Sequence, residues 1–203
     1  TVLDTPNDFT LLGQWFILIL IQLGGFGIMT ISTVALHVMG KRLSLRQERL
    51  LTTLTETSHS DLIGSLVMIV RFTLLTELAG ATLLTGCFLS AGDSLPLSAW
   101  KGLFTSISAF CNAGFALQSD NLVSYQTSPL VLHAVAALII LGSMPPATCL
   151  LLPAWIRGRA IPLAPRIAIV TTVALLLART VCFLVFEWNN AFAALSIADR
   201  LHN

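Results

Sequence analysis

The sequence predicts an all-α integral membrane protein, and three observations support this fold class. Of the 203 residues, 55% are hydrophobic and 10% are charged, whereas soluble domains contain about 25% charged residues. The mean hydropathy is +0.84. Four stretches with few or no charges each reach the ~20 residues that a helix needs to cross the hydrocarbon core. The net charge of +1, without a basic face, gives no indication of nucleic-acid binding.

The four predicted spans are residues 9–40, 62–91, 127–156 and 167–186. The first and third contain no Asp, Glu, Lys or Arg; the second contains Arg71 and Glu77, and the fourth contains Arg179. An ionisable side chain inside a span costs about 2.5–3.5 kcal/mol on insertion scales and is a functional candidate. Arg71 is six residues from Glu77 and lies on another helix face. We therefore expect Arg179 to be the partner of Glu77, and Glu77 to support the neighbouring loop through hydrogen bonds.

The connections between the spans differ in charge, which predicts their side of the membrane. The connections after the first and third spans carry the basic residues Lys41, Arg42, Arg46, Arg49, Arg157, Arg159 and Arg166. We expect both connections on the cytoplasmic side. The segment before the first span and the connection over 92–126 carry Asp4, Asp8, Asp93 and Asp120 against one Lys101. These segments are expected outside.

A short amphipathic helix is predicted within the outer connection, in the stretch LPLSAWKGLFTSISAF. Ser98 is placed to cap its N-terminus, and apolar residues recur at helical spacing until Asn112 and Gly114 end the pattern. The helix is too short to cross the membrane. Irregular backbone at membrane depth persists only where it is buried in protein or lines a wet cavity. A short helix followed by a glycine-containing segment is therefore typical of a re-entrant pore loop.

A weak internal repeat with a period of 118 residues places IQLGGFGIMT at 21–30 over IILGSMPPAT at 139–148. Gly24 then matches Gly142, and Gly40 with Lys41 matches Gly158 with Arg159. Both copies run from outside to inside, so the repeat is parallel. Pro145 and Pro146 should kink the third span. The glycines Gly24, Gly25 and Gly27 are expected to let the first and third spans pack closely.

The segment SISAFCNAGF at 106–115 has two readings. Small residues such as those in CNAG allow the tight turn of a filter whose carbonyls replace the water around a cation, and the C-terminal end of the preceding helix favours a cation. The hydroxyls of Thr105, Ser106 and Ser108 would then fix the turn by bonding its N–H groups. A plain turn after a helix is the commoner outcome for such composition.

The stretch KGLFTSISAFCNAGF resembles the second pore helix and filter of the Trk/Ktr/HKT superfamily of potassium transporters. It is most similar to the bacterial Ktr-type membrane subunit of the TrkH family. IQLGGFGIMT resembles the segment after the first filter of that family, and TLLTELAGATLL resembles its second M1 helix. The resemblance covers nearly the whole chain, in one motif order. Two departures are Cys111, where the family often has Asn, and GSMPP at 142–146.

The resemblance implies M1–pore loop–M2 repeats around a pseudo-fourfold pore, of which the chain would be a fragment. Residues 1–60 would end the first repeat. Residues 61–160 would form the second, with a pore helix at 98–110 and a filter at 111–115. Residues 161–203 would begin the third.

The resemblance also implies the site. The filter carbonyls that would bind the cation are those of Cys111, Asn112, Ala113 and Gly114. The side chains that would support the pore loop are Glu77, Ser106 and Ser108. The implied function is potassium uptake across the cell membrane, with sodium as a candidate coupling ion and no other cofactor or metal. The expected partners are K+, membrane lipid, a second copy in a homodimer and a cytoplasmic nucleotide-binding regulatory ring.

A membrane-embedded enzyme or receptor with a re-entrant binding loop is the alternative. Against an enzyme, the sequence has no nucleophile–base pair, no H-E-x-x-H and no paired intramembrane aspartates. The four cysteines include no C-x-x-C pair, and the histidines are scattered, so neither a zinc site nor a disulfide framework is indicated.

Overall fold

A computed structural model describes residues 4–40 and 62–188, and in these ranges the chain is helical with no β-strand. The basic connection predicted at 41–49 lies outside the described residues. The elements are α1 (Thr5–Asp8), α2 (Leu11–Gly40), α4 (Leu62–Ser90), α5 (Leu95–Phe110), a 3-10 turn η1 (Val123–Tyr125), α6 (Pro129–Ser143), α7 (Pro146–Ile156) and α8 (Leu163–Glu187). The prediction of an all-α fold is confirmed.

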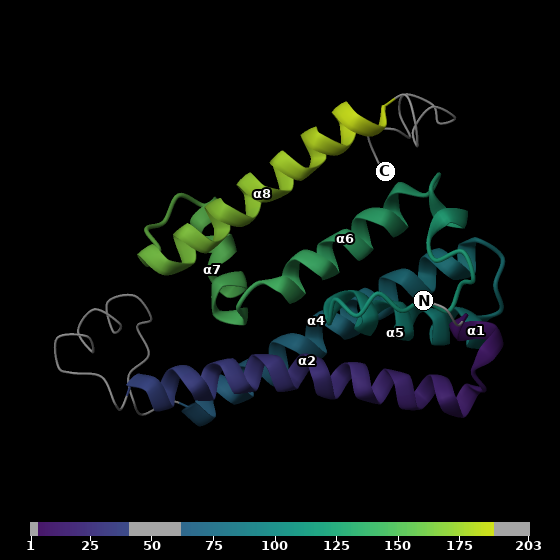
Figure 1. Ribbon diagram of the computed structural model, residues 1–203, viewed down its shortest axis with the longest axis horizontal. Helices are drawn as coiled ribbons and strands as arrows, with labels where there is room; N and C mark the ends of the chain where they lie inside the picture. Colours follow the sequence, from purple (N-terminus) through teal and green to yellow (C-terminus); the bar gives the residue numbers. More distant parts are fainter. Residues whose placement is uncertain (1–3, 41–61, 189–203) are drawn as a thin grey trace.

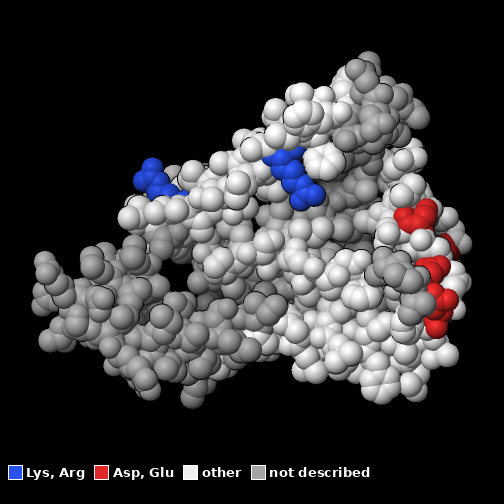
Figure 2. Space-filling view, in the orientation of Figure 1, with Lys and Arg blue, Asp and Glu red and all other residues white. Residues whose placement is uncertain are grey.

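The long helices run alternately in opposite directions (Figure 1). Helices α2 and α6 run from the end of the molecule that holds α1 toward the opposite end, and α4 and α8 return. On the face in Figure 2, acidic residues gather near α1, and basic residues lie elsewhere, some of them at the end that holds α7. Both arrangements agree with the predicted topology and with the parallel direction of the two repeat copies.

Two helices are each long and apolar enough to cross a membrane, namely α4 over Leu66–Ser90 and α8 over Pro165–Phe186. Helices α6 and α7 pass the same test only together, and they are bent by 115° at their junction, which is the geometry of a broken span or of a re-entrant loop. The portion Leu11–Gly27 of α2 is also apolar, and the whole helix has 30 residues. At 1.5 Å per residue, ~45 Å of helix is ample for the hydrocarbon core.

The break between α6 and α7 falls at the prolines that predicted a kink. Met144 and Pro145 both have extended backbone, with ψ angles of 147° and 132°. A residue before proline is driven out of the α region by a clash with the proline ring, which stops α6 at Ser143. The matched part of α2 is one continuous helix, so the two repeat copies differ here.

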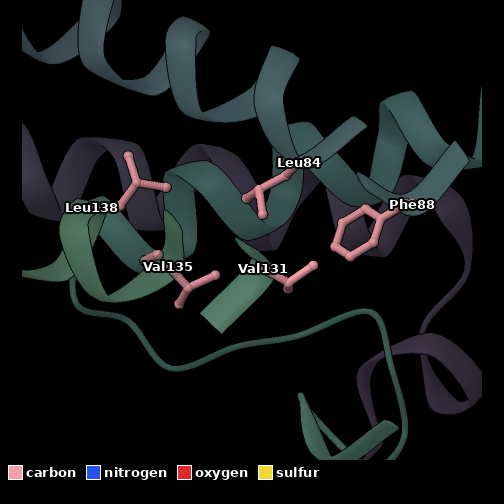
Figure 3. Packing of buried hydrophobic residues seen from close by; sticks show 6 residues of the cluster. Leu84, Phe88, Val131, Val135 and Leu138 are labelled. Atoms are coloured by element: carbon pink, nitrogen blue, oxygen red, sulfur yellow. The ribbon is translucent and has the colours of Figure 1, made fainter. Parts of the chain in front are cut away.

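Helix α5 lies between α4 and α6 and forms the core with them. Figure 3 shows the largest apolar cluster, which joins Leu84 and Phe88 of α4 to Val131, Val135 and Leu138 of α6. Close approach of α4 and α5 depends on a small residue, because a Cβ at Gly102 would overlap the Thr85 hydroxyl. The core therefore fixes the position of α5 against α4 and α6.

The start of α5 differs from the prediction. Ser94, not Ser98, is the N-cap residue, and the helix begins at Leu95 with Pro96 in its first turn. Proline suits this position because its missing N–H would have no partner there. Ser98 lies inside the helix, where it is fully buried.

The outer connections carry charged pairs near the predicted outer face. Lys101 Nζ lies 2.8 Å from Asp93 Oδ2. Ser124 donates its hydroxyl and its N–H to Asp120 Oδ2, and these hydrogen bonds lower the pKa of Asp120. Asp120 thus remains ionised at neutral pH.

Candidate functional site

The segment 111–115 leaves the end of α5 through an irregular backbone. Cys111 follows the last helical residue, and the backbone then takes a left-handed conformation at Asn112 (φ 54°) and again at Gly114 (φ 75°). Asparagine and glycine are the residues that adopt this region at least cost. The choice of residues in CNAG therefore fits the shape of the turn.

The hydrogen bonds of this segment use its N–H groups. The N–H of Cys111 donates to Ile107 O at 2.9 Å, that of Asn112 to Ala109 O at 3.1 Å, and that of Ala113 to Ser108 O at 2.8 Å. By contrast, no donor among the described residues bonds the carbonyls of residues 111 to 114. Asn112 and Gly114 are exposed, and Cys111 and Ala113 are half-buried, so water can reach this segment. These four oxygens are thus available to a ligand that accepts their lone pairs.

Ser108 joins the two ends of the segment. Its hydroxyl, on a side chain only 2% exposed, donates to Phe115 O at 2.6 Å and accepts from Phe115 N–H at 3.0 Å. The predicted hydrogen bond from a hydroxyl to the turn is therefore present at Ser108.

The other two hydroxyls do not bond the turn, contrary to the prediction. Ser106 points to the opposite side of α5 and donates to the backbone carbonyl of Glu77 at 2.7 Å. Thr105 is 5% exposed, and its hydroxyl has no partner among the described residues. The reason is helical geometry, since residues two apart differ by about 200° around the axis.

Glu77 is buried in α4, at 3% exposure, and its carboxylate has two side-chain neighbours. Gln22 Nε2 of α2 donates to Oε2 at 3.0 Å, and the thiol of Cys111 lies 3.8 Å from Oε1. Glu77 thus contacts the residue that follows α5, and its role in supporting the loop stays a prediction. The predicted partner Arg179 is wrong, because Arg179 is exposed on α8 and its guanidinium stacks 5.7 Å from the centre of the Phe183 ring.

The glycines of α2 were predicted to let the first and third spans pack closely, but the glycines of α2 and α6 contact the end of α5 or nothing at all. A Cβ on Gly25 would lie 2.6 Å from Cys111 Sγ, and one on Gly142 would overlap the carbonyl oxygen of Phe110, whereas Gly24 and Gly27 have no neighbour within 4 Å. Two glycines, one from each helix, thus allow α2 and α6 to approach the end of α5. The contacts of Gly25 and Gly142 with the end of α5 were not predictable from the sequence pattern.

A pocket of about 300 Å³ lies on one side of the segment. Asn112, Gly114 and the Thr105 hydroxyl line its polar part, and Val135 and Ile139 of α6 line its apolar part. Within the described ranges, no group of three or more His, Cys, Asp or Glu side chains could hold a metal ion. The ligands that this region offers are backbone and amide oxygens, which suit hard cations.

The C-terminal end of α5 adds an electrostatic preference. Its 16 residues end at Phe110, directly before the four carbonyls. The aligned peptide dipoles of a helix place about half a negative charge at its C-terminus, which favours a cation there.

Gln22 is the residue of this region that the sequence did not single out. It lies within IQLGGFGIMT, yet nothing in the sequence indicates its contact with Glu77, 55 residues away. A polar residue inside an uncharged span is the one available signal.

Comparison with known proteins agrees with the resemblance. The TrkH family, described as cation transport protein, matches residues 1–193. The chain is 36% identical over 199 residues to Ktr system potassium uptake protein B of Vibrio alginolyticus, covering 93% of this chain and 42% of that protein. It is 30% identical over 190 residues to potassium/sodium uptake protein NtpJ of Enterococcus hirae, with the same coverage of 93% and 42%. Ktr system potassium uptake protein B of Bacillus subtilis is 36% identical over 149 residues, which is 70% of this chain and 32% of that protein. The chain thus spans less than half the length of these relatives.

Proposed function

The chain belongs to the TrkH family of cation transport proteins, an integral membrane family, and from that premise we propose that it takes part in potassium uptake across the cell membrane. In this proposal, the carbonyls of Cys111, Asn112, Ala113 and Gly114 form one filter segment and bind K+. The segment would contribute one part of a filter with pseudo-fourfold symmetry.

One observation carries the proposal, which is the one-sided hydrogen bonding of residues 111–114. The N–H groups of residues 111 to 113 donate to backbone carbonyls of α5. The four carbonyl oxygens of residues 111–114, by contrast, have no donor among the described residues. A selectivity filter needs this arrangement, because carbonyl oxygens must replace the water shell of the ion. The helix C-terminus behind them favours the positive charge.

Carbonyl oxygens can bind both potassium and sodium ions. One relative is named for potassium uptake and another for potassium and sodium uptake. We take K+ as the transported ion and Na+ as the candidate coupling ion. The further partners in the proposal are a second copy of the protein, membrane lipid and a cytoplasmic nucleotide-binding ring, all on the ground of the family resemblance.

Since the relatives are transport proteins, the chain is not an enzyme, and the enzyme alternative is set aside. A receptor with a re-entrant binding loop is the remaining alternative. It predicts ligand binding at the segment without ion flux, and uptake measurements distinguish it.

Gly114→Ala and Gly114→Ser in the full-length protein test the proposal. Nothing lies within 4 Å of a Cβ at this position, so the added atom meets no clash, but the φ of 75° costs a residue with a Cβ about 1–2 kcal/mol. The turn should relax and the carbonyl of residue 114 should rotate. Rubidium uptake should fall at least tenfold, and the preference for Rb+ over Na+ should decrease.

Gly92→Ala is the matched control. Gly92 also has a left-handed φ, of 104°, with no atom within 4 Å of a Cβ, but it lies in the turn between α4 and α5. It carries a similar backbone strain away from the filter segment, so uptake should stay within twofold of the wild type. Equal uptake and ion preference in the Gly114 variants and the wild type would refute the filter assignment.

A further inference from the structure

Helix α2 approaches the filter segment with one face. Leu18, Gln22 and Gly25 are spaced by four and three residues, so they lie along one face of α2. Leu18 is buried against Phe104 of α5, and Gly25 meets Cys111. Gln22 is the polar residue between these two contacts. The face of α2 that touches α5 therefore has an amide at its centre.

The partner of that amide is the carboxylate of Glu77. Gln22 Nε2 donates to Glu77 Oε2 at 3.0 Å, while Cys111 Sγ lies 3.8 Å from Glu77 Oε1. We call Gln22, Glu77 and Cys111 the filter clamp. Its members come from α2, from α4 and from the segment after α5, so that one carboxylate connects three elements.

The contacts of Glu77 with Gln22 and with Cys111 differ in strength. A buried carboxylate requires donors, because an unpaired buried charge is costly. An amide N–H at 3.0 Å is an ordinary strong donor, whereas a thiol is a weak one. Among the described residues, these are the two side-chain donors to Glu77. The orientation of the carboxylate toward Cys111 thus depends on Gln22.

Resting on the proposed function, we infer that Gln22 is a positioning residue for the ion filter. It fixes the carboxylate of Glu77, which in turn holds the Cys111 side chain and with it the first filter carbonyl. Gln22 does not touch the ion. Loss of its amide would let the Cys111 residue move and would weaken ion binding without removing any filter ligand.

The test exchanges the two members of the amide–carboxylate pair. In Gln22→Glu, two carboxylates face each other at about the separation of the present hydrogen bond, and like charges at that distance repel. The KM for rubidium uptake should rise at least tenfold. In the double variant Gln22→Glu/Glu77→Gln, one amide again faces one carboxylate, and the KM should return to within threefold of the wild type. A role of Gln22 in filling space alone predicts an unchanged KM in the neutral variant Gln22→Met, which keeps the length of the side chain, whereas a positioning role predicts a rise in KM there too.

Gln14→Glu is the matched control on the same helix. Gln14 accepts from the indole N–H of Trp100 through Oε1 at 2.9 Å, which a carboxylate preserves, and donates Nε2 to Phe9 O at 3.2 Å, which a carboxylate loses. The change therefore also removes one amide donor from α2, but away from Glu77 and Cys111. Its KM for rubidium should stay within twofold of the wild type. All rates are compared per amount of protein in the membrane.

A second readout follows the Cys111 thiol directly. In a full-length background in which every cysteine except Cys111 is changed to Ser, Cys87, Cys149 and Cys182 among them, Gln22→Leu should raise the rate of Cys111 modification by a small methanethiosulfonate at least fivefold, and Gln14→Glu should not change it. An unchanged rate in Gln22→Leu, or a double variant as impaired as Gln22→Glu, would overturn the inference. If the wild-type protein took up no rubidium, the proposed function would fail, and the labelling rates would still decide for or against the clamp.

Discussion

Removal of the Ser108 hydroxyl should release the filter segment from α5. In Ser108→Ala, Phe115 loses both the donor to its carbonyl and the acceptor of its N–H, which are bonded at 2.6 and 3.0 Å. Two neutral hydrogen bonds contribute about 1 kcal/mol each, and the groups left partly buried without a partner add about 1 kcal/mol more. The equilibrium between the held and the released segment should thus shift by about 3 kcal/mol, which is roughly a hundredfold.

The assay is the initial rate of rubidium uptake as a function of rubidium concentration. Because a released segment no longer presents its carbonyls together, we expect the KM to rise at least tenfold at an unchanged amount of protein in the membrane. Ser90→Ala is the control, since this exposed hydroxyl donates only to Cys87 O within α4. A KM for Ser108→Ala within twofold of the wild type would refute the reasoning that Ser108 holds the filter.

Two glycine positions give further predictions. Gly142→Ala places a methyl group on the carbonyl of Phe110, and overpacking of this kind costs about 1–3 kcal/mol, so the thermal unfolding temperature in detergent should fall. An unchanged unfolding temperature would contradict this contact. Gly25→Ala pushes against Cys111 Sγ and should lower rubidium uptake severalfold, whereas Gly24→Ala, with no neighbour within 4 Å, should not. Equal uptake in both variants would count against the approach of α2 to the filter.

Much of the fold followed from the sequence because membrane insertion imposes simple rules. The spans follow from uncharged length, and the break after α6 follows from Pro145 and Pro146. The assignment of the basic connections to the cytoplasmic side stays a prediction. The short helix over 95–110 followed from its apolar spacing, although its start was placed three residues late, because Ser94 and Ser98 offer the same capping group. The division into repeats at 1–60, 61–160 and 161–203 stays a prediction.

The candidate site was predictable only in part. Residues 111–114 were marked by their small and permissive side chains, which the left-handed angles at Asn112 and Gly114 explain. The pairing of Glu77 was not predictable, because it depends on the rotation of α2 and α4 about their axes. Charge complementarity suggested Arg179, but a neutral amide was closer. Likewise, only the rotation of α5 decides that Ser106 contacts α4 while Ser108 contacts the filter segment.

The missing side chain at Gly142 also restricts how α6 can move. Its neighbours Leu141 and Ser143 both carry a Cβ, so a screw displacement of α6 by one residue, about 1.5 Å along its axis and about 100° around it, would drive a side chain into the Phe110 carbonyl. The register of α6 against α5 is therefore locked. The 115° bend between α6 and α7 begins directly after this contact, so the position of the bend along α5 is fixed together with the register.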